Sequence, residues 1–232
     1  MLSSRVVNVT SRFQPNLARA FGCPGRRNRI ARLMRAERLF ARQRSKYRHA
    51  TTHSLHGGPI APNRLQRFTV QRPNQVWVTD ATGILTGQGW LYLVAVLDIC
   101  SRRVVGWAMS PMLDAPLTIA ALRMALRQRR PVGSLIVHSD RGSQFASTAY
   151  RQVLAQHGLL ASMSRQGNCY DNAFIESFWS SLKYELVYHH RFATRAVART
   201  AIFDYIETFH NRIRLHSSLT YRSPINFESK LN

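Results

Sequence analysis

Apolar and β-branched residues occur in three short runs in the middle of the chain, separated by turn residues. The runs cover residues 75–85, 90–100 and 102–110. Runs of this length, rich in β-branched and aromatic residues and broken by short polar stretches, are typical of antiparallel strands joined in a meander. The pattern therefore predicts three consecutive strands.

Helical and strand patterns alternate after this meander. Helical periodicity covers 115–130 and 147–158, short apolar runs cover 134–140 and 159–165, and a further helical pattern starts near residue 172. The resulting order, β-β-β-α-β-α-β-α, is that of an α/β protein with helices packed on the faces of a mixed sheet.

Charge restricts the partners of the chain. Its 232 residues include 33 Lys and Arg but only 11 Asp and Glu, for a net charge of +22. Such an excess favours nucleic acid as the partner. No apolar run is long enough to span a membrane, and no secretory signal is visible. The three cysteines form no C-x-x-C pair, which argues against a zinc finger and is typical of a reducing cytoplasm.

The charge is concentrated at the N-terminal end. Residues 1–72 hold sixteen of the basic residues and a single acid, Glu37. We predict an unassigned segment (1–25), a basic DNA-binding helical arm (26–50), a linker (51–73) and a main domain with a C-terminal helical segment (74–232). Arg32 and Arg35 are the expected phosphate contacts of the arm. The alternative is a solvated amphipathic helix without a specific partner.

Three acids lie in the segment 167–186, in a chain that has few. Asp171 precedes the helical pattern, so N-capping is its expected role. Projected at 100° per residue, Glu176 lies on the polar face and Glu185 at the edge of the apolar arc. That arc is formed by Ile175, Phe178, Trp179, Leu182 and Leu186. Glu176 is therefore the candidate for chemistry.

Two aspartates stand at predicted strand ends. Asp80 follows "VWVT", and Asp140 follows "IVHS" with Gly142 shortly after it. Ligands of open α/β sheets bind at strand ends, so these two carboxylates and Glu176 could meet at one point. Oxygen ligands of this kind suit Mg²⁺. A pair of such ions about 3.5–4 Å apart can promote phosphodiester exchange.

Four blocks carry a family resemblance: "WVTD", "HSDRGSQF", "SRQGNCYDNAFIESFWSSLKYEL" and "YIETFHNRIRLHSSLTYRSP". In this order they resemble the catalytic protein of bacterial insertion-sequence transposases of the IS-three type, whose DDE core is similar to retroviral integrase. Asp140 and Glu176 are separated by thirty-five residues, which matches the family's D-(35)-E interval.

The resemblance implies an RNase H-like fold and a metal-binding catalytic triad of Asp80, Asp140 and Glu176. It implies two bound Mg²⁺ ions, with Mn²⁺ as a surrogate. The implied reaction is cleavage of DNA at element ends followed by strand transfer, without a covalent protein intermediate. A homo-oligomer on DNA, in the bacterial cytoplasm at the nucleoid, is implied as well.

Further residues near these blocks each allow two interpretations. Lys183 shares the face of Glu176 and either holds a DNA phosphate or is a plain surface lysine. Asn172 either faces the site or serves capping and packing. His138 either lines the site or packs within its strand, and Asp98 is expected to fix a turn rather than bind metal. His210 and His216 are expected to serve structure or contact DNA backbone rather than catalyse.

The resemblance begins near Arg26, and residues 1–25 show none. The chain is therefore expected to be a second-frame product, shortened at its N-terminus, that works with a first-frame helix-turn-helix partner. Two other classes stay open. One is a non-catalytic DNA-binding remnant that coats DNA or interferes with an intact transposase, and the other is an RNase H-like nuclease that hydrolyses without joining.

Overall fold

The computed structural model describes residues 32, 36, 58–65, 69–164 and 172–231. Five strands form one sheet in the order β3-β2-β1-β4-β5. Their bounds are β1 Val76–Thr86, β2 Gly89–Asp98, β3 Val104–Ser110, β4 Ile136–Ser139 and β5 Leu160–Met163. Each lies within a few residues of a predicted run, so the strand predictions are confirmed.

The sheet is mixed, as predicted. Strand β1 pairs with β2 in an antiparallel hairpin and with β4 in parallel. The parallel pairing runs only from Val76 opposite Ile136 to Thr79 opposite Ser139. The sequence had indicated that Asp80 ends the first strand. This prediction was wrong, because β1 continues to Thr86. Asp80 is instead the first residue of β1 beyond its pairing with β4.

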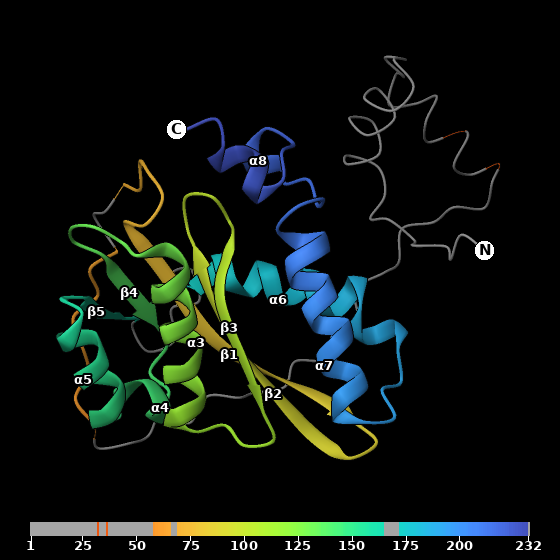
Figure 1. Cartoon of the computed structure of the whole chain (residues 1–232), viewed down its shortest axis with the longest axis horizontal. Coiled ribbons are helices and arrows are strands. Elements are labelled where there is room, and N and C mark those ends of the chain that lie inside the picture. The colour runs from red at the N-terminus through yellow and green to blue at the C-terminus, as the bar shows by residue number, and fades with distance from the viewer. Residues whose placement is uncertain (1–31, 33–35, 37–57, 66–68, 165–171, 232) are drawn as a thin grey trace.

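Helices cover both faces of this sheet (Figure 1). On one face lie α3 Ala115–Arg129, α4 Ser143–Ala146 and α5 Thr148–Gln156, and on the other lie α6 Ala173–Glu185 and α7 Arg195–Phe203. A π-helical segment, η3 Asp204–His210, continues α7. Short turns η2 Val187–His189 and η4 Ser217–Leu219, and helix α8 Pro224–Glu228, complete the chain. Helix α4 was not predicted because four residues are too few to show a helical period.

Alternation along β1 creates two separate cores. Val76 and Val78 pack with α6 and η3, whereas Trp77 and Ala81 pack with α3 and α5. Successive side chains of a strand point to opposite faces, so β1 is apolar on both faces and buried by both helical layers. The sheet consequently separates the α3–α5 layer from the layer formed by α6, α7 and η3.

Close packing of α3 on β3 depends on one glycine. A Cβ atom on Gly106 would meet the carbonyl oxygen of Ala121 and lie 2.6 Å from the nitrogen of Ala125. The helix starts sharply, because the side chain of Asp114 accepts a hydrogen bond from the Leu117 N–H at 3.0 Å. Cap and close contact together hold α3 in place on the sheet.

The C-terminal block is anchored to the core by buried polar groups. Asn211 brackets Val104, accepting its N–H and donating to its carbonyl, both at 3.0 Å. The guanidinium of Arg214 donates to both carboxylate oxygens of Glu185, at 2.8 Å for the shortest contacts. His210 is buried beside the Arg102 carbonyl oxygen, at 3.1 Å. The structural role expected for His210 is thereby confirmed.

Little of the basic arm lies within the described residues. Arg32 is helical and exposed, whereas Arg35 and most of the predicted arm and linker lie outside the described part of the chain. Among the described residues, no helix combines the length and apolar character needed to cross a membrane.

Candidate active site

The register of the sheet sets Asp80 beside Asp140. The last parallel pair joins Thr79 of β1 to Ser139 of β4, and each aspartate is the next residue along its strand. Adjacent strands lie about 4.8 Å apart, so the two backbones leave the pairing side by side. The strands end this pairing because Asp140 turns away, with its Oδ1 accepting the Gly142 N–H at 2.9 Å.

Helix α6 carries the third acid to the same region. The indole Nε1 of Trp179 donates to Oδ2 of Asp80 at 2.9 Å, which fixes the first turns of α6 over β1. Glu176 lies one turn before Trp179 on this helix. Four members of the projected apolar arc, Ile175, Phe178, Trp179 and Leu182, are buried as predicted. Their burial leaves Glu176 on the less buried side of the helix.

Electrostatics show that the three carboxyl groups share one region. Burial, together with the negative charges of Asp140 and Glu176, raises the pKa of Asp80 to about 7. Hydrogen bonds from the Ala81 backbone and from Trp179 act in the opposite direction. A carboxyl whose pKa is raised by burial and by like charges is typical of a functional site.

Lys183 lies close enough to this region to interact with it. Burial lowers the pKa of its ammonium group, while the negative charge of Asp80 raises it. Lys183 comes two turns after Glu176 on α6, so the helix presents an acid and a cation to the same aspartate. Lys183 is half-buried, and its role as a phosphate contact stays a prediction.

The donor set fits a divalent cation, although the three side chains are not closed around a single point. No group of three His, Cys, Asp or Glu side chains within the described residues is arranged to hold a metal ion. One oxygen of Asp80 is engaged by Trp179 and one of Asp140 by Gly142. Three like charges repel one another, and a bound cation with oxygen preference would relieve the repulsion that raises the pKa of Asp80.

Other residues singled out from the sequence lie outside this cluster. Asp98 accepts hydrogen bonds from the backbone N–H groups of Asn74, Cys100 and Ser101, which confirms its turn-fixing role. His138 is buried, with its Nδ1 2.9 Å from the Ser162 hydroxyl, as expected of a packed strand histidine.

The start of α6 differs slightly from the prediction. Its N-cap position is Asn172, which makes no side-chain capping bond, and Asp171 lies outside the described residues. Asn172 is 7% exposed. Burial favours the packing interpretation for this residue over capping.

Trp179 is the site residue that sequence reasoning missed. Its apolar ring placed it in the core arc, and it is indeed buried. The signal lay in its angular position, at the edge of that arc nearest the polar face, where an indole N–H can reach a neighbouring acceptor.

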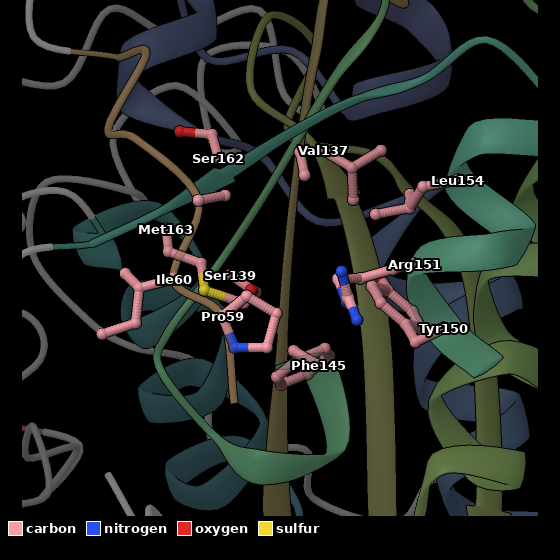
Figure 2. A pocket seen from close by; sticks show the side chains of 12 residues that line it. Pro59, Ile60, Val137, Ser139, Phe145, Tyr150, Arg151, Leu154, Ser162 and Met163 are labelled. Atoms are coloured by element: carbon pink, nitrogen blue, oxygen red, sulfur yellow. The ribbon is translucent and has the colours of Figure 1, made fainter. Parts of the chain in front are cut away.

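A cavity of about 190 Å³ lies behind β4, away from the acids (Figure 2). Residues 59–61 border it on one side and α5 on the other, with Tyr150, Arg151 and Leu154 on the α5 side. Val137 and Ser139 of β4 contribute to its wall. None of the three carboxylates lines this cavity, so it is distinct from the acid cluster.

Comparisons with known families point to one type of protein. Two family models, both described as "Integrase core domain", match residues 70–169 and 176–231. Together they span the acid cluster and the anchored C-terminal block.

Individual proteins that are similar to this chain over most of its length come from bacterial insertion sequences. The chain is 49% identical over 230 residues to the "Insertion element IS600 uncharacterized 31 kDa protein" of Shigella sonnei, covering 99% of this chain and 84% of that protein. It is 42% identical over 213 residues to "Transposase InsF for insertion sequence IS3A" of Escherichia coli (strain K12), covering 91% and 74%. The first alignment includes most of residues 1–25, so the expectation that this segment has no resemblance was wrong.

Solved structures support the fold. The HTLV-2 integrase catalytic core domain in complex with magnesium matches with a TM-score of 0.52 at 16% identity, over 69% of this chain and 99% of that one. A chain of the simian T-cell lymphotropic virus intasome in complex with PP2A regulatory subunit B56 gamma matches with a TM-score of 0.57 at 13% identity, over 93% and 70%. The fold is thus integrase-like and RNase H-like.

Proposed function

The chain belongs to the IS3-family transposases with an integrase core domain, and we propose that it cuts DNA strands at the ends of an insertion sequence and transfers them to new sites. The observation that carries the proposal is the convergence on Asp80 of Asp140 from the neighbouring strand and Glu176 from α6. The DNA substrate would place the protein at the nucleoid in the bacterial cytoplasm.

The proposed reaction has two steps, hydrolysis of one phosphodiester followed by strand transfer to another. In the first, a water oxygen bonds to the phosphorus at the element end, the bond from phosphorus to the 3′ oxygen breaks, and a 3′-hydroxyl is released. In the second, that hydroxyl bonds to the phosphorus of another phosphodiester and displaces its 3′ oxygen. No serine, tyrosine or cysteine of the chain is consumed as a nucleophile.

Asp80, Asp140 and Glu176 would hold two divalent cations, Mg²⁺ with Mn²⁺ as a surrogate. When bound, such cations would lower the pKa of the attacking hydroxyl or water and offset charge on the leaving oxygen. The chain's own contribution is to orient the carboxylates: Trp179 holds Asp80 by a hydrogen bond, and the turn at Gly142 holds Asp140.

Lys183 would bind a phosphate of the DNA end. Its proximity to Asp80 supports this role, since it puts a cation next to the carboxylates that would otherwise repel the substrate. Arg32 and Arg35 of the arm would add phosphate contacts outside the core. A homo-oligomer on paired ends and a first-frame partner protein remain part of the proposal.

The test uses the full chain and labelled duplexes taken from the DNA that flanks its gene, with Mg²⁺ or Mn²⁺. Nicked and joined products are expected with the wild type and should disappear with Glu176→Gln. Asp204→Asn, which removes an exposed acid elsewhere, is the matched control and should retain both products.

Three other results would speak against the proposal. Nicks without joined strands would favour a nuclease that only hydrolyses. Tight DNA binding with no product, even with a first-frame protein added, would favour a non-catalytic remnant. Equal products from wild type and Glu176→Gln would remove Glu176 from the chemistry.

A further inference from the structure

The α3–α5 layer differs in charge from the opposite face of the molecule. Residues 114–158 contain six arginines and two acids, Asp114, which caps α3, and Asp140 of the acid cluster. Residues 172–231, which include the helices of the other face, contain eight Lys and Arg but also five Asp and Glu. The α3–α5 layer therefore has a clear excess of positive charge.

Three of these arginines form a stripe along α3. Arg123 and Arg127, spaced i and i+4, lie about 40° apart on the helix, and Arg130 follows as the left-handed C-cap residue, one turn beyond Arg127. All three are exposed, and within the described part of the chain none of their side chains makes a hydrogen bond or ion pair. Their neighbour Arg129 is instead engaged by Glu228 at 2.8 Å.

The stripe does not serve the fold. The inner face of α3 packs through Leu117, Ala121, Leu122, Ala125 and Leu126. Repulsion between Arg123 and Arg127 weakens the helix by a few tenths of a kcal/mol, and the position of Arg127 in the last turn offsets this through the helix dipole, so the arginines give the helix little net stability. An exposed row of arginines without ion-pair partners is suited to bind an anionic partner.

Duplex DNA suits the stripe better than an acidic protein does. B-DNA carries one charge per about 1.7 Å of axis, so a stripe of about 10 Å faces roughly six phosphates. Protein interfaces are built around buried apolar and aromatic anchors. Among the described residues, no exposed large apolar side chain lies on α3. All the cations are arginines, whose planar guanidinium binds phosphate through two N–H groups.

The position of the stripe decides which duplex it can contact. Asp80 is held from the α6 side of the sheet by Trp179, whereas α3 packs on the opposite face. The sheet and a helix about 10–12 Å in diameter lie between the stripe and the acid cluster. DNA lying on α3 is therefore not the segment that enters the active site of the same chain.

We propose that the stripe of Arg123, Arg127 and Arg130 binds the phosphate backbone of a second DNA duplex. This proposal rests on the proposed function, in which a first duplex is bound at the carboxylates. In an assembly on two DNA ends, this surface would let each chain hold the duplex that another copy acts on.

The experiment measures capture of a second duplex by the full chain. The protein is saturated with an element-end duplex fixed to beads, and a fluorescent duplex of unrelated sequence is added across a series of salt concentrations. The test variant is Arg123→Gln/Arg127→Gln/Arg130→Gln. Arg191→Gln/Arg212→Gln/Lys230→Gln, which removes the same charge from exposed positions outside α3, α4 and α5, is the matched control.

The α3 variant is expected to capture the second duplex at least tenfold more weakly than wild type. Its plot of log affinity against log salt should be shallower by about 3, since each lost phosphate contact contributes about 0.9. The control should stay within threefold of wild type. Both variants should keep the wild-type melting temperature, because the substituted side chains are exposed.

Equal capture by the α3 variant and wild type would overturn the proposal, as would an equal loss in both variants, which would reflect net charge alone. Displacement of the second duplex by polyglutamate more readily than by unlabelled DNA would overturn it in favour of an acidic protein. Cleavage of the bead-bound duplex in Mg²⁺ is recorded in the same reaction. Arginine-dependent capture without cleavage would uphold the surface while the proposed function fails.

Discussion

The indole nitrogen of Trp179 and the carboxylate of Asp80 are joined by a 2.9 Å hydrogen bond across 99 residues of chain. This bond connects α6 to the central strand β1. It lies where the pairing of β1 with β4 ends, directly before Asp80 and Asp140. It makes Trp179 a positioning residue for the acid cluster, since a core aromatic directs the orientation of a candidate catalytic carboxylate.

Replacing Trp179 by Phe tests this positioning role. The change keeps an aromatic ring in the core but removes the donor to Asp80, so DNA nicking should fall at least tenfold. The free energy of unfolding should fall by about 1.5–3 kcal/mol, the range for hydrogen bonds to charged groups. Urea denaturation and a nicking assay measure the two effects.

Trp107→Phe is the matched control for that variant. Its Nε1 donates to Glu207 at 2.8 Å, so the same type of bond is lost on β3, two strands away from Asp80. A similar loss of stability with normal nicking is expected. If Trp107→Phe reduces nicking as strongly as Trp179→Phe, the loss reflects stability alone and the positioning role is refuted.

Divalent cations should stabilise the folded chain through the carboxylates. A ligand that binds only the native state at a hundredfold excess over its Kd adds about 2.7 kcal/mol. Mg²⁺ or Mn²⁺ should raise the Tm of the wild type, and EDTA should reverse the shift. Asp80→Asn should lose most of the shift and Asp204→Asn should keep it; an undiminished shift in Asp80→Asn would place the cations elsewhere.

The ion pair of Glu185 and Arg214 should be essential for stability. Arg214 is 4% exposed and donates to both carboxylate oxygens of Glu185 and to Ser181, with the His216 ring 3.4 Å from its Nη1. Glu185→Gln should cost about 3–5 kcal/mol, because it leaves a buried guanidinium uncompensated. The double variant Glu185→Leu/Arg214→Met should recover much of that loss, as measured by urea unfolding. Additive effects of Glu185→Leu and Arg214→Met in a double-mutant cycle would contradict this account.

Glu228 should make folding sensitive to acid. Burial alone raises the pKa of this carboxyl, but hydrogen bonds from Arg129, Ser101 and Arg103 outweigh burial and hold the pKa below its usual 4.5. Its contribution to stability is therefore complete above pH 4.5 and is lost as the pH falls through the lower folded-state pKa.

At pH 7, Glu228→Gln should lower the free energy of unfolding by about 1.5–3 kcal/mol, the range for bonds to charged groups. The difference from wild type should narrow below pH 4.5, as measured by urea unfolding over a pH series. A difference that stays constant down to pH 3 would show that the carboxylate charge is not what stabilises this contact.

Local patterns along the chain were sufficient to predict the strands, the main helices and the type of sheet. Strand runs and helical periods reflect burial on one or two faces, a property that each segment carries in its own residues. The thirty-five residues between Asp140 and Glu176, read together with the family blocks, identified the acids before any contact was known. The apolar arc of α6 was likewise visible in its spacing.

Contacts between distant segments were decided by the tertiary structure. The parallel register of β1 and β4 showed that Asp80 ends a pairing rather than a strand, since strand β1 runs on to Thr86 in its hairpin with β2. The partners of Trp179, Glu185 and Glu228 lie far away along the chain, and a hydrogen bond leaves no periodic trace in either partner's own segment. Residue types and local spacing therefore determined which groups this protein has for chemistry, whereas packing of α6 against β1 decided how they meet.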